Sequence, residues 1–455
     1  MPAPTSSLPL WSALPFVVYL LSIAFIPLVW GHFWEKNRNK FLFAVAVSLP
    51  VVLFLSLSSH GEARWLWDSA KEYVTFIVLI ATLFIISGGI YLEGSLAGTP
   101  LLNTAFLAAG AVLASIIGTT GASMLLIRPL LRANETRERK VHLVVFFIFI
   151  VSNAGGLLTP LGDPPLFLGF LRGVPFLWTL RLVAPWAIVN GVLLILCNLV
   201  DQAVFNKEEK ERPGSQLEDV MKVKEPLRIR GGFNLLLLLG VTLLTFGVGS
   251  GAERLHLSED GQKAIQVVGL AILAGLSLAL TPQDVRRANR FTWGPIIEVS
   301  VIFIGIFITM VPALKILEVR GAEFGVVHPW QFFWASGALS SILDNAPTYL
   351  TFSAAAVGVV NHLDPAAGIA AGNFGALTLH AGGASLLAAV SCGSVLMGAN
   401  TYIGNGPNFM VKAIAEENKI KMPSFFGYTL WSIGILIPLF LILTAVFFRT
   451  SPWHS

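Results

Sequence analysis

Residues 152–165 read SNAGGLLTPLGDPP, and they interrupt one long apolar segment of the chain. The runs before and after them, 141–151 and 166–171, are almost entirely apolar. Between these runs stand three glycines, three prolines and the carboxylate of Asp163, a composition that a continuous helix does not tolerate. The stretch therefore predicts a membrane helix that is broken near its middle.

A second stretch, MGANTYIGNGPN at residues 397–408, has the same character. The two stretches align as Thr-x-x-Gly-(Asp/Asn)-x-Pro-x-Phe, at residues 159–167 and 401–409. The sequence thus contains the broken segment twice, once near each end of the chain.

Composition places the chain in a lipid bilayer. Of its 455 residues, 55% are apolar and only 12% are charged, whereas a soluble domain carries about 25% charged residues. The net charge of +4 is small and lies in loops, which argues against a nucleic-acid partner. Cys197 and Cys392 lie in apolar runs and are expected to be free core thiols. The first residues lack a basic region, so we expect no cleaved signal peptide.

Ten apolar segments are predicted to span the membrane, because each unbroken one is near the roughly 20 residues that cross a bilayer core. They are residues 14–30, 41–59, 73–92, 141–172 (broken), 183–205, 233–250, 264–281, 295–312, 382–417 (broken) and 425–448. Two further apolar regions, 101–131 and 331–360, turn at Gly118-Thr119-Thr120-Gly121 and at Asp344-Asn345-Ala346-Pro347. Both are interpreted as re-entrant hairpins, which membranes tolerate only where protein or water surrounds the turn.

The order of these segments indicates an internal duplication. Residues 1–205 and 233–448 each contain five spans, with a hairpin before the fourth. Because five is odd, the second copy is inverted. A cytoplasmic linker, 206–232, joins the copies, and a tail follows at 449–455. The predicted fold is therefore an all-α polytopic membrane protein of two inverted repeats, an arrangement typical of secondary transporters with a site near the bilayer midplane.

Basic residues set the expected orientation. The clusters at 36–40, 128–140 and 286–290 fall on one side of the membrane if the N-terminus is outside. The positive-inside rule makes that side cytoplasmic. We therefore expect a multi-pass protein of a bacterial cytoplasmic membrane.

The helix breaks supply candidate ion-binding groups. A broken helix leaves carbonyl and N–H groups unpaired, and nearby side-chain oxygens can complete a cage for a hard cation such as Na⁺. The candidates are Thr119, Thr120, Ser123, Asn153, Thr159 and Asp163 in the first half, and Asp344, Asn345, Thr348, Asn400, Thr401, Asn405 and Asn408 in the second.

Each hairpin tip is expected to pack on the break of its own half. Asp163 would then face Thr119-Thr120, and Asn405 would face Asp344. The two aspartates also have structural interpretations. Asp163 could form a turn before Pro164-Pro165, and Asp344 could cap the second hairpin helix.

These motifs resemble the ion transporter superfamily. The resemblance rests on Asp344–Pro347, on SNAGG with GDPP in the first break, and on NTYIGNGPN in the second. The group includes NhaD-type sodium/proton antiporters, citrate transporters of the CitMHS type, arsenite permeases and dicarboxylate/sodium symporters. The resemblance implies a scaffold that holds a mobile transport domain of hairpins and broken helices, working as a homodimer by an elevator-like movement. The Ser-Asn-Thr tips of the dicarboxylate symporters are absent here, which argues against dicarboxylate transport.

The leading functional hypothesis is sodium/proton antiport, with Asp163 and Asp344 as exchangeable carboxylates and Na⁺ ligands. It implies no enzymatic activity and no cofactor beyond transported or coupling ions. The expected partners are the bilayer, small ions or a small organic anion, and a second copy of the chain in a homodimer. The alternative is a citrate-type anion symporter coupled to a cation. An intramembrane aspartyl protease would need Gly-x-Gly-Asp and Tyr-Asp motifs, which Gly162-Asp163 and Leu343-Asp344 do not form. A passive channel would not require two inverted, broken repeats.

Overall fold

The computed structural model describes residues 8–34, 36–58, 62–94, 97–214, 228–251 and 259–449. Over these residues the chain is helical apart from one two-stranded ribbon, which confirms the predicted all-α polytopic fold. Ten described helices are long and apolar enough to cross a membrane. The expected features at residues 1–7, in the linker at 215–227 and in the tail at 450–455 lie outside this part.

The first half contains three long helices, a hairpin, a broken helix and a final long helix. The elements are η1 (Leu10–Ala13), α1 (Leu14–Val29), α2 (Gly31–Trp34), α3 (Asn37–Leu57), α4 (Ala63–Ser87), β1 (Tyr91–Glu93), α5 (Pro100–Ile117), α6 (Thr119–Ala133), α7 (Val141–Ile150), η2 (Ala154–Leu158), α8 (Pro164–Leu171), η3 (Phe176–Leu182) and α9 (Val183–Glu211).

The second half repeats this order. Its elements are β2 (Arg228–Arg230), α11 (Phe233–Gly251), α12 (Glu259–Leu280), α13 (Gln283–Ala288), α14 (Gly294–Arg320), η4 (Gly321–Phe324), α15 (Pro329–Ser340), α16 (Asn345–Leu363), η5 (Pro365–Ala367), η6 (Phe374–Leu379), α17 (Ala381–Met397), η7 (Gly398–Asn400), α18 (Gly406–Glu417), α19 (Phe425–Leu443) and a short π-helical turn, η8 (Thr444–Phe448).

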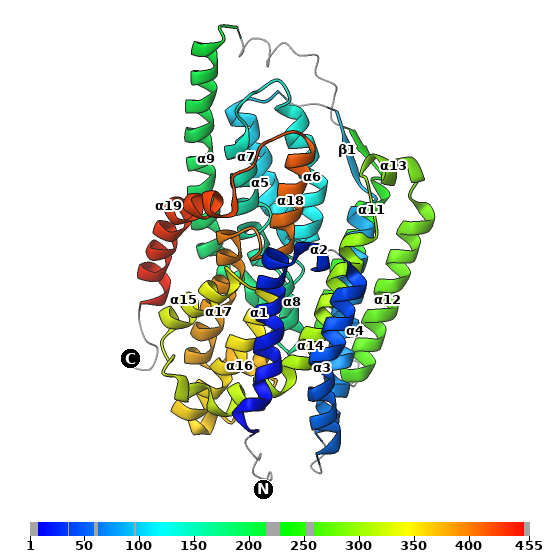
Figure 1. Cartoon of the computed structure of the whole chain (residues 1–455), viewed down its shortest axis with the longest axis vertical. Helices are drawn as coiled ribbons and strands as arrows, with labels where there is room; N and C mark the ends of the chain where they lie inside the picture. Colours follow the sequence, from blue (N-terminus) through cyan, green and yellow to red (C-terminus); the bar gives the residue numbers. More distant parts are fainter. Residues whose placement is uncertain are drawn as a thin grey trace.

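The two hairpins enter the molecule from opposite ends. Helices α5 and α6 occupy the upper half of Figure 1, whereas α15 and α16 occupy the lower half. The loops rich in basic residues, around β1 and α13, lie at the upper end together with the end of α9. We call this the basic end of the molecule.

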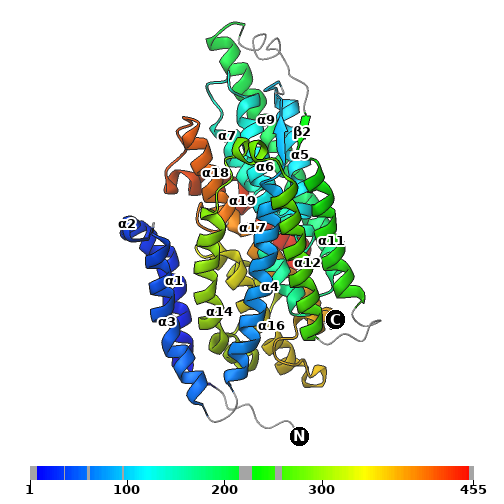
Figure 2. The ribbon, with the colours of Figure 1, turned by 90° about the vertical axis from the view of Figure 1, so that its right-hand side faces the viewer.

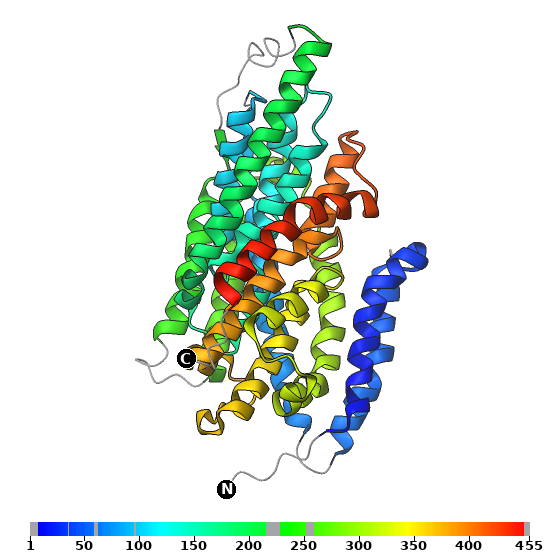
Figure 3. The same cartoon turned by 90° about the vertical axis from the view of Figure 1, so that its left-hand side faces the viewer.

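Two groups of helices can be distinguished. Helices α1, α3, α4, α11, α12 and α14 form one group, which we call the frame, and the pair α1 and α3 stands at its edge in Figure 2. Helices α5–α9 and α15–α19 form the other, the hairpin group, and α19 crosses its surface obliquely in Figure 3.

Helix α14 ties the frame together through hydrogen bonds to its backbone. Tyr19 of α1 donates to Ile302 O at 3.0 Å, and Ser69 of α4 donates to Phe307 O at 2.6 Å. At the basic end, Lys40 of α3 pairs with Glu298 of α14 at 2.5 Å. Polar side chains thus fix helices whose outer faces are largely apolar, since apolar contacts alone give little net attraction between helices in lipid.

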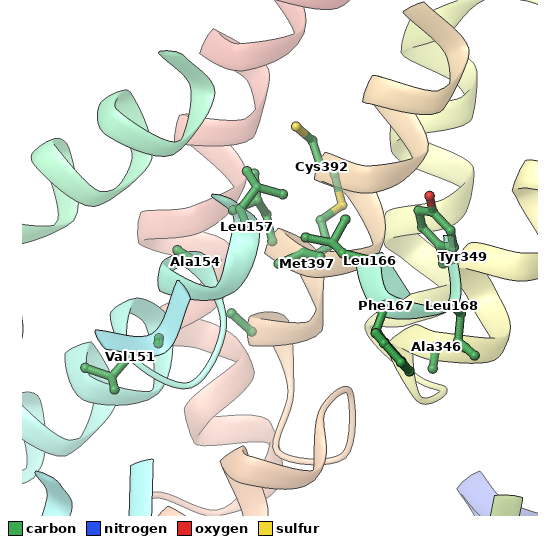
Figure 4. Packing of buried hydrophobic residues seen from close by; sticks show 14 of the residues in the cluster. Val151, Ala154, Leu157, Leu166, Phe167, Leu168, Ala346, Tyr349, Cys392 and Met397 are labelled. Atoms are coloured by element: carbon green, nitrogen blue, oxygen red, sulfur yellow. The ribbon is translucent and has the colours of Figure 1, made fainter. Parts of the chain in front are cut away.

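The first halves of the broken helices form the centre of the hairpin group. From His142 to Ile150 every residue of α7 is buried, and α17 is covered almost as completely. A helix that is apolar all round belongs in a core. In Figure 4, Leu166 and Phe167 of α8 lie between Met397 of α17 and Ala346 of α16, so side chains of the two halves interlock. The two cysteines are free and buried, as predicted.

Several helices begin earlier or end later than predicted. Helix α4 begins at Ala63 rather than residue 73, and α14 continues to Arg320. The added turns carry charges that pair with one another, for example Lys71 with Asp68 at 3.0 Å. Helix α5, predicted as half of a hairpin, is among the ten helices long enough to span, whereas Phe233–Val248 of α11 is a shorter apolar helix.

Two parts of the predicted linker lie in described elements of secondary structure. Its first residues continue α9 to Glu211, and Arg228–Arg230 forms β2. Strand β2 pairs antiparallel with β1, so that Tyr91 lies opposite Arg230. This ribbon fastens the segment after α4 to the segment before α11 and so joins the two halves of the chain at the basic end.

A buried ionic cluster holds the first hairpin to α9 near the basic end. Arg137 and Asp201 pair at 2.6 Å, and neither side chain is exposed. Asp201 also contacts His142 Nε2 at 2.8 Å and accepts from Asn103 Nδ2 at 2.9 Å. Each partner compensates the desolvation of the others, so removing one leaves a charge buried without compensation.

Arg137→Gln is therefore expected to destabilise the protein strongly. The neutral amide leaves the Asp201 carboxylate buried, and breaking such a pair costs about 3–5 kcal/mol. The measurement is the thermal unfolding midpoint of the purified protein in detergent. Arg139→Gln is the matched control, because the Arg139–Glu211 pair is exposed and such pairs contribute about 0–1 kcal/mol. Equal shifts in both variants would contradict the role of the cluster.

Close backbone approach shapes the breaks. A Cβ on Gly162 would lie 2.1 Å from Gly156 O, and one on Gly404 would lie 2.6 Å from Gly398 O. In addition, Gly118 turns the first hairpin with φ at +83°, a conformation that side chains disfavour. The two breaks therefore share one folded shape that only glycine permits.

Gly162→Ala is expected to lower the thermal unfolding midpoint and the yield of folded protein, since backbone would have to move to admit the methyl group. Gly406→Ala is the matched control at the start of α18, where a Cβ meets nothing within 4 Å. If both variants unfold at the wild-type temperature, the close backbone approach at Gly162 does not require glycine.

Candidate functional site

Each hairpin tip packs on the break of its own half, with the same contacts in both. Thr159 Oγ1 donates to Ser115 O in the first half. At the aligned position of the second half, Thr401 Oγ1 donates to Ser341 O at 2.5 Å. The hydroxyl of each threonine also accepts a backbone N–H two residues later, from Leu161 at 3.2 Å and Ile403 at 3.3 Å. Thr159 and Thr401 thus fix the break to the tip rather than pointing into open space.

Asp163 stands at the start of α8 and is 1% exposed. Its extended backbone, with φ at −148° and ψ at 143°, places it in the N-cap position before Pro164. As the sequence predicted, it faces the first tip, where Thr119 Oγ1 donates to Asp163 Oδ1 at 2.8 Å. The backbone N–H of Thr119 donates to Gly162 O at 2.8 Å, which holds the tip against the break.

The second half also reaches Asp163. Asn345 Nδ2, at the tip of the second hairpin, donates to Asp163 Oδ2 at 2.5 Å. Asn405 Nδ2, at the start of α18, lies 3.5 Å from Asp163 Oδ1 and donates to Asn153 Oδ1 at 3.1 Å. Both hairpins and both breaks therefore meet at one carboxylate.

This geometry corrects the expectation of two separate sites, one in each half. Asn405 was expected to face Asp344, but its hydrogen bonds run to Ser152, Asn153 and Asp163 in the first half. Asp344 is instead the N-cap of α16, with Oδ1 accepting from Ala346 N at 3.1 Å. The capping interaction holds the carboxylate against its own helix and explains why the mirrored pair does not form.

The remaining candidates surround this centre. Asn153 donates to Asn408 Oδ1 at 2.7 Å and so links the two breaks. Ser123 lies against Ser152, with 2.8 Å between their hydroxyl oxygens, and Thr348 donates to Asp344 O at 3.1 Å. Thr120 borders a small cavity beside Asp163. Asn400 donates to Ser341 Oγ at 2.8 Å, on the side of the second hairpin.

Two buried amide oxygens in this region have no hydrogen-bond partner. They are Asn345 Oδ1 and Asn400 Oδ1. An unpaired buried acceptor is unusual and calls for an explanation such as an ion. Among the described residues no group of three or more His, Cys, Asp or Glu side chains could hold a metal. A cation bound here would therefore rely mainly on neutral oxygens, which suits Na⁺ better than a transition metal.

A cavity of about 30 Å³ lies beside Asp163, between the first tip and α4 of the frame. Leu79, Leu83 and Phe84 of α4 close one side of it, and Gly118 and Thr119 border the other. It holds one or two small particles such as water molecules. In this conformation the centre is occluded by the frame.

Some polar residues of the site were missed from the sequence. The backbone carbonyl of Ser152 accepts a hydrogen bond from Asn405 Nδ2. The backbone carbonyls of Ser115 and Ser341 accept hydrogen bonds from the hydroxyls of Thr159 and Thr401. Ser115 and Ser341 each stand three residues before the turn of their hairpin, at Gly118 and Asp344, so the sequence does contain a signal for them. No such signal marks Tyr428, whose hydroxyl donates to Ala399 O at 2.8 Å from α19.

Comparison with known proteins agrees with this architecture. The family model CitMHS_2, described as "Putative citrate transport", matches residues 5–448. A search of curated proteins finds no match. The family match, together with ten helices able to cross a bilayer, makes the chain an integral, multi-pass membrane protein and a transporter by family. Because the match covers nearly its whole length, the chain belongs to this family.

Proposed function

We propose that the protein carries a citrate-type organic anion across the membrane together with a cation. The observation that supports this proposal most directly is the meeting of both repeats at Asp163. The sequence alone favoured sodium/proton antiport. The family description and the kinds of group around Asp163 now favour anion symport.

Four helices begin at this centre. Asp163 and Asn405 are the N-cap residues of α8 and α18, and Thr119 and Asn345 are the first residues of α6 and α16. Helix N-termini carry partial positive charge and unpaired N–H groups, so together they favour an anion. In the present conformation the carboxylate of Asp163 takes that place and accepts the available hydroxyl and amide donors. A substrate carboxylate could use the same donors once Asp163 is neutralised.

Neutralisation of Asp163 by a cation would couple cation binding to anion binding. An ionised side chain at membrane depth costs several kcal/mol, and a proton or Na⁺ at Asp163 removes much of that cost. The unpaired oxygens of Asn345 and Asn400 are suitable ligands for a hard cation. Cation binding and anion binding would then favour each other at one centre, as symport requires.

Sodium/proton antiport remains the second candidate, and the small cavity favours it. A space of about 30 Å³ beside Asp163 admits a water molecule or a small cation but not citrate.

Anion transport therefore requires that the hairpin group separate from α4. The division into frame and hairpin group supports such an elevator-like movement. We propose that it takes place in a homodimer whose basic end lies in the cytoplasm.

Asp163→Asn is expected to reduce citrate uptake by roughly tenfold or more, since a hydrogen-bonded charged group contributes about 1.5–3 kcal/mol. The measurement is uptake of labelled citrate into proteoliposomes under an imposed Na⁺ or pH gradient, with and without Mg²⁺. Asp364→Asn is the matched control, because Asp364 caps η5 at the surface.

Two results would contradict anion symport. One is wild-type uptake by Asp163→Asn. The other is the absence of citrate uptake by the wild-type protein under every gradient. Na⁺-driven dissipation of a pH gradient without citrate, abolished by Asp163→Asn, would instead establish the antiport alternative.

Substitutions of Asp344 separate its charge from its capping role. Asparagine caps helices about as well as aspartate, so Asp344→Asn should fold with a wild-type unfolding midpoint. If the carboxylate also takes part in cation binding, the variant should need a higher Na⁺ or H⁺ concentration for half-maximal citrate uptake. Asp344→Ala should in addition lose about 1 kcal/mol of stability. If Asp344→Asn needs the same Na⁺ or H⁺ concentration for half-maximal uptake as the wild-type protein, then Asp344 acts only as a helix cap.

A further inference from the structure

A second, much larger cavity lies at the end of the molecule opposite the basic end. Its volume is about 1180 Å³. The first turns of α4 and α12 and the last turns of α14 line it on the frame side. The segment after α8 and residues 370–373 line it on the side of the hairpin group. Asp163 is not among the lining residues, so this cavity is distinct from the site at the helix breaks.

The lining of this cavity is charged and net positive. The cationic side chains are Arg64, Lys71, Arg172, Lys263 and Lys315, and the acidic ones are Asp68, Glu72 and Asp260. Some of these charges are already paired, as Lys71 is with Asp260 at 2.7 Å. Lys315 also pairs, at 2.9 Å, with Glu318 outside the lining. The small excess of cations that is left favours an anion over a cation as the occupant.

Arg172 is largely buried and still has an N–H group without a hydrogen-bond partner. It follows α8, and its Nη2 pairs with Glu72 Oε2 of α4 at 2.9 Å, with 11% and 14% of the two side chains exposed. Its guanidinium also lies over the ring of Phe374, 5.2 Å from the centroid. The Nε–H is buried and has no partner. An unpaired buried donor destabilises the structure, and a carboxylate bound to both Nε and Nη2 would supply the missing partner.

A second unpaired donor lines the same cavity from the frame. Gln266 of α12 is 3% exposed, and its Nε2 has no hydrogen-bond partner. Arg172 and Gln266 belong to different helix groups. A ligand with several carboxylates could therefore engage both, whereas a monocarboxylate could engage only one.

We propose that this cavity is a loading site for a polycarboxylate such as citrate, in which a ligand carboxylate replaces Glu72 on Arg172. Arg172 ends the half-helix that begins at Asp163, and Glu72 belongs to the frame. The exchange therefore removes an ion pair that joins the hairpin group to the frame. The contribution of this site to uptake rests on the anion transport proposed above, whereas binding in the cavity does not.

The test measures protection of a cysteine placed in the cavity. Ala371 lines the cavity and is exposed, and both native cysteines are buried, so Ala371→Cys provides one accessible thiol. The rate of maleimide labelling of the full chain in detergent is recorded against citrate, with acetate at equal ionic strength as the reference. Citrate at ten times its dissociation constant should slow labelling roughly tenfold, because the free fraction falls as 1/(1 + [L]/Kd).

Arg172→Gln in this background should abolish protection, and Gln266→Met, at a different helix, should weaken it. Glu72→Gln should lower the citrate concentration that gives half protection, since the competing carboxylate is gone. Arg181→Gln is the matched control, an exposed arginine of η3 outside the cavity lining. Asp163→Asn should leave protection intact even when uptake is lost, which separates this proposal from the transport function.

Four outcomes would overturn the loading site. The first is that acetate protects the cysteine as well as citrate does, and the second is that citrate still protects it fully in Arg172→Gln and Gln266→Met. The third is that Glu72→Gln leaves the citrate concentration for half protection unchanged. The fourth is that protection is lost in Asp163→Asn. The last result would place the bound citrate at the helix breaks.

Discussion

The rest of the structure depends on how the buried carboxylate of Asp163 is stabilised near the centre of the protein. Asp163 is almost fully buried, where an isolated charge would be unstable. Its two oxygens accept from Thr119 and Asn345, the first residues of two hairpin helices. The hairpin turns make this possible, because they bring the side-chain hydroxyl of Thr119 and the side-chain amide of Asn345 to the point where the first broken helix is interrupted at Asp163. The interrupted segments therefore provide the polarity that an apolar environment lacks.

Close packing is the second requirement. The breaks can carry polar groups to the centre only if tip and break approach within hydrogen-bond distance. Gly156 and Gly162 in one half, and Gly398 and Gly404 in the other, bring backbone against backbone where a methyl group would collide. Thr159 and Thr401 then fasten each break to its tip. Small residues and short polar side chains thus hold together a centre that apolar packing alone would leave loose.

Much of the fold could be predicted from the sequence, because apolar length, helix breakers and repeat order are local or periodic signals. The hairpins, the breaks and the contact of Asp163 with Thr119 followed from them. The contacts of Asn345 and Asn405 with Asp163 did not, since they depend on how the two repeats dock, which spacing does not encode. The early start of α4 was also missed. Arg64, Asp68 and Lys71 resemble loop residues until a cavity and ion pairs accommodate them.

The unequal residues at equivalent positions of the two repeats bear on the history of the chain. Asp163 in one repeat corresponds to Asn405 in the other, and the two side chains lie 3.5 Å apart. An ancestor built from two identical copies of the first repeat would place two carboxylates at this distance, where they could not both ionise. An asparagine in one copy turns that repulsion into a hydrogen bond. Two copies that are encoded separately along one chain can differ at this position, whereas two identical subunits could not.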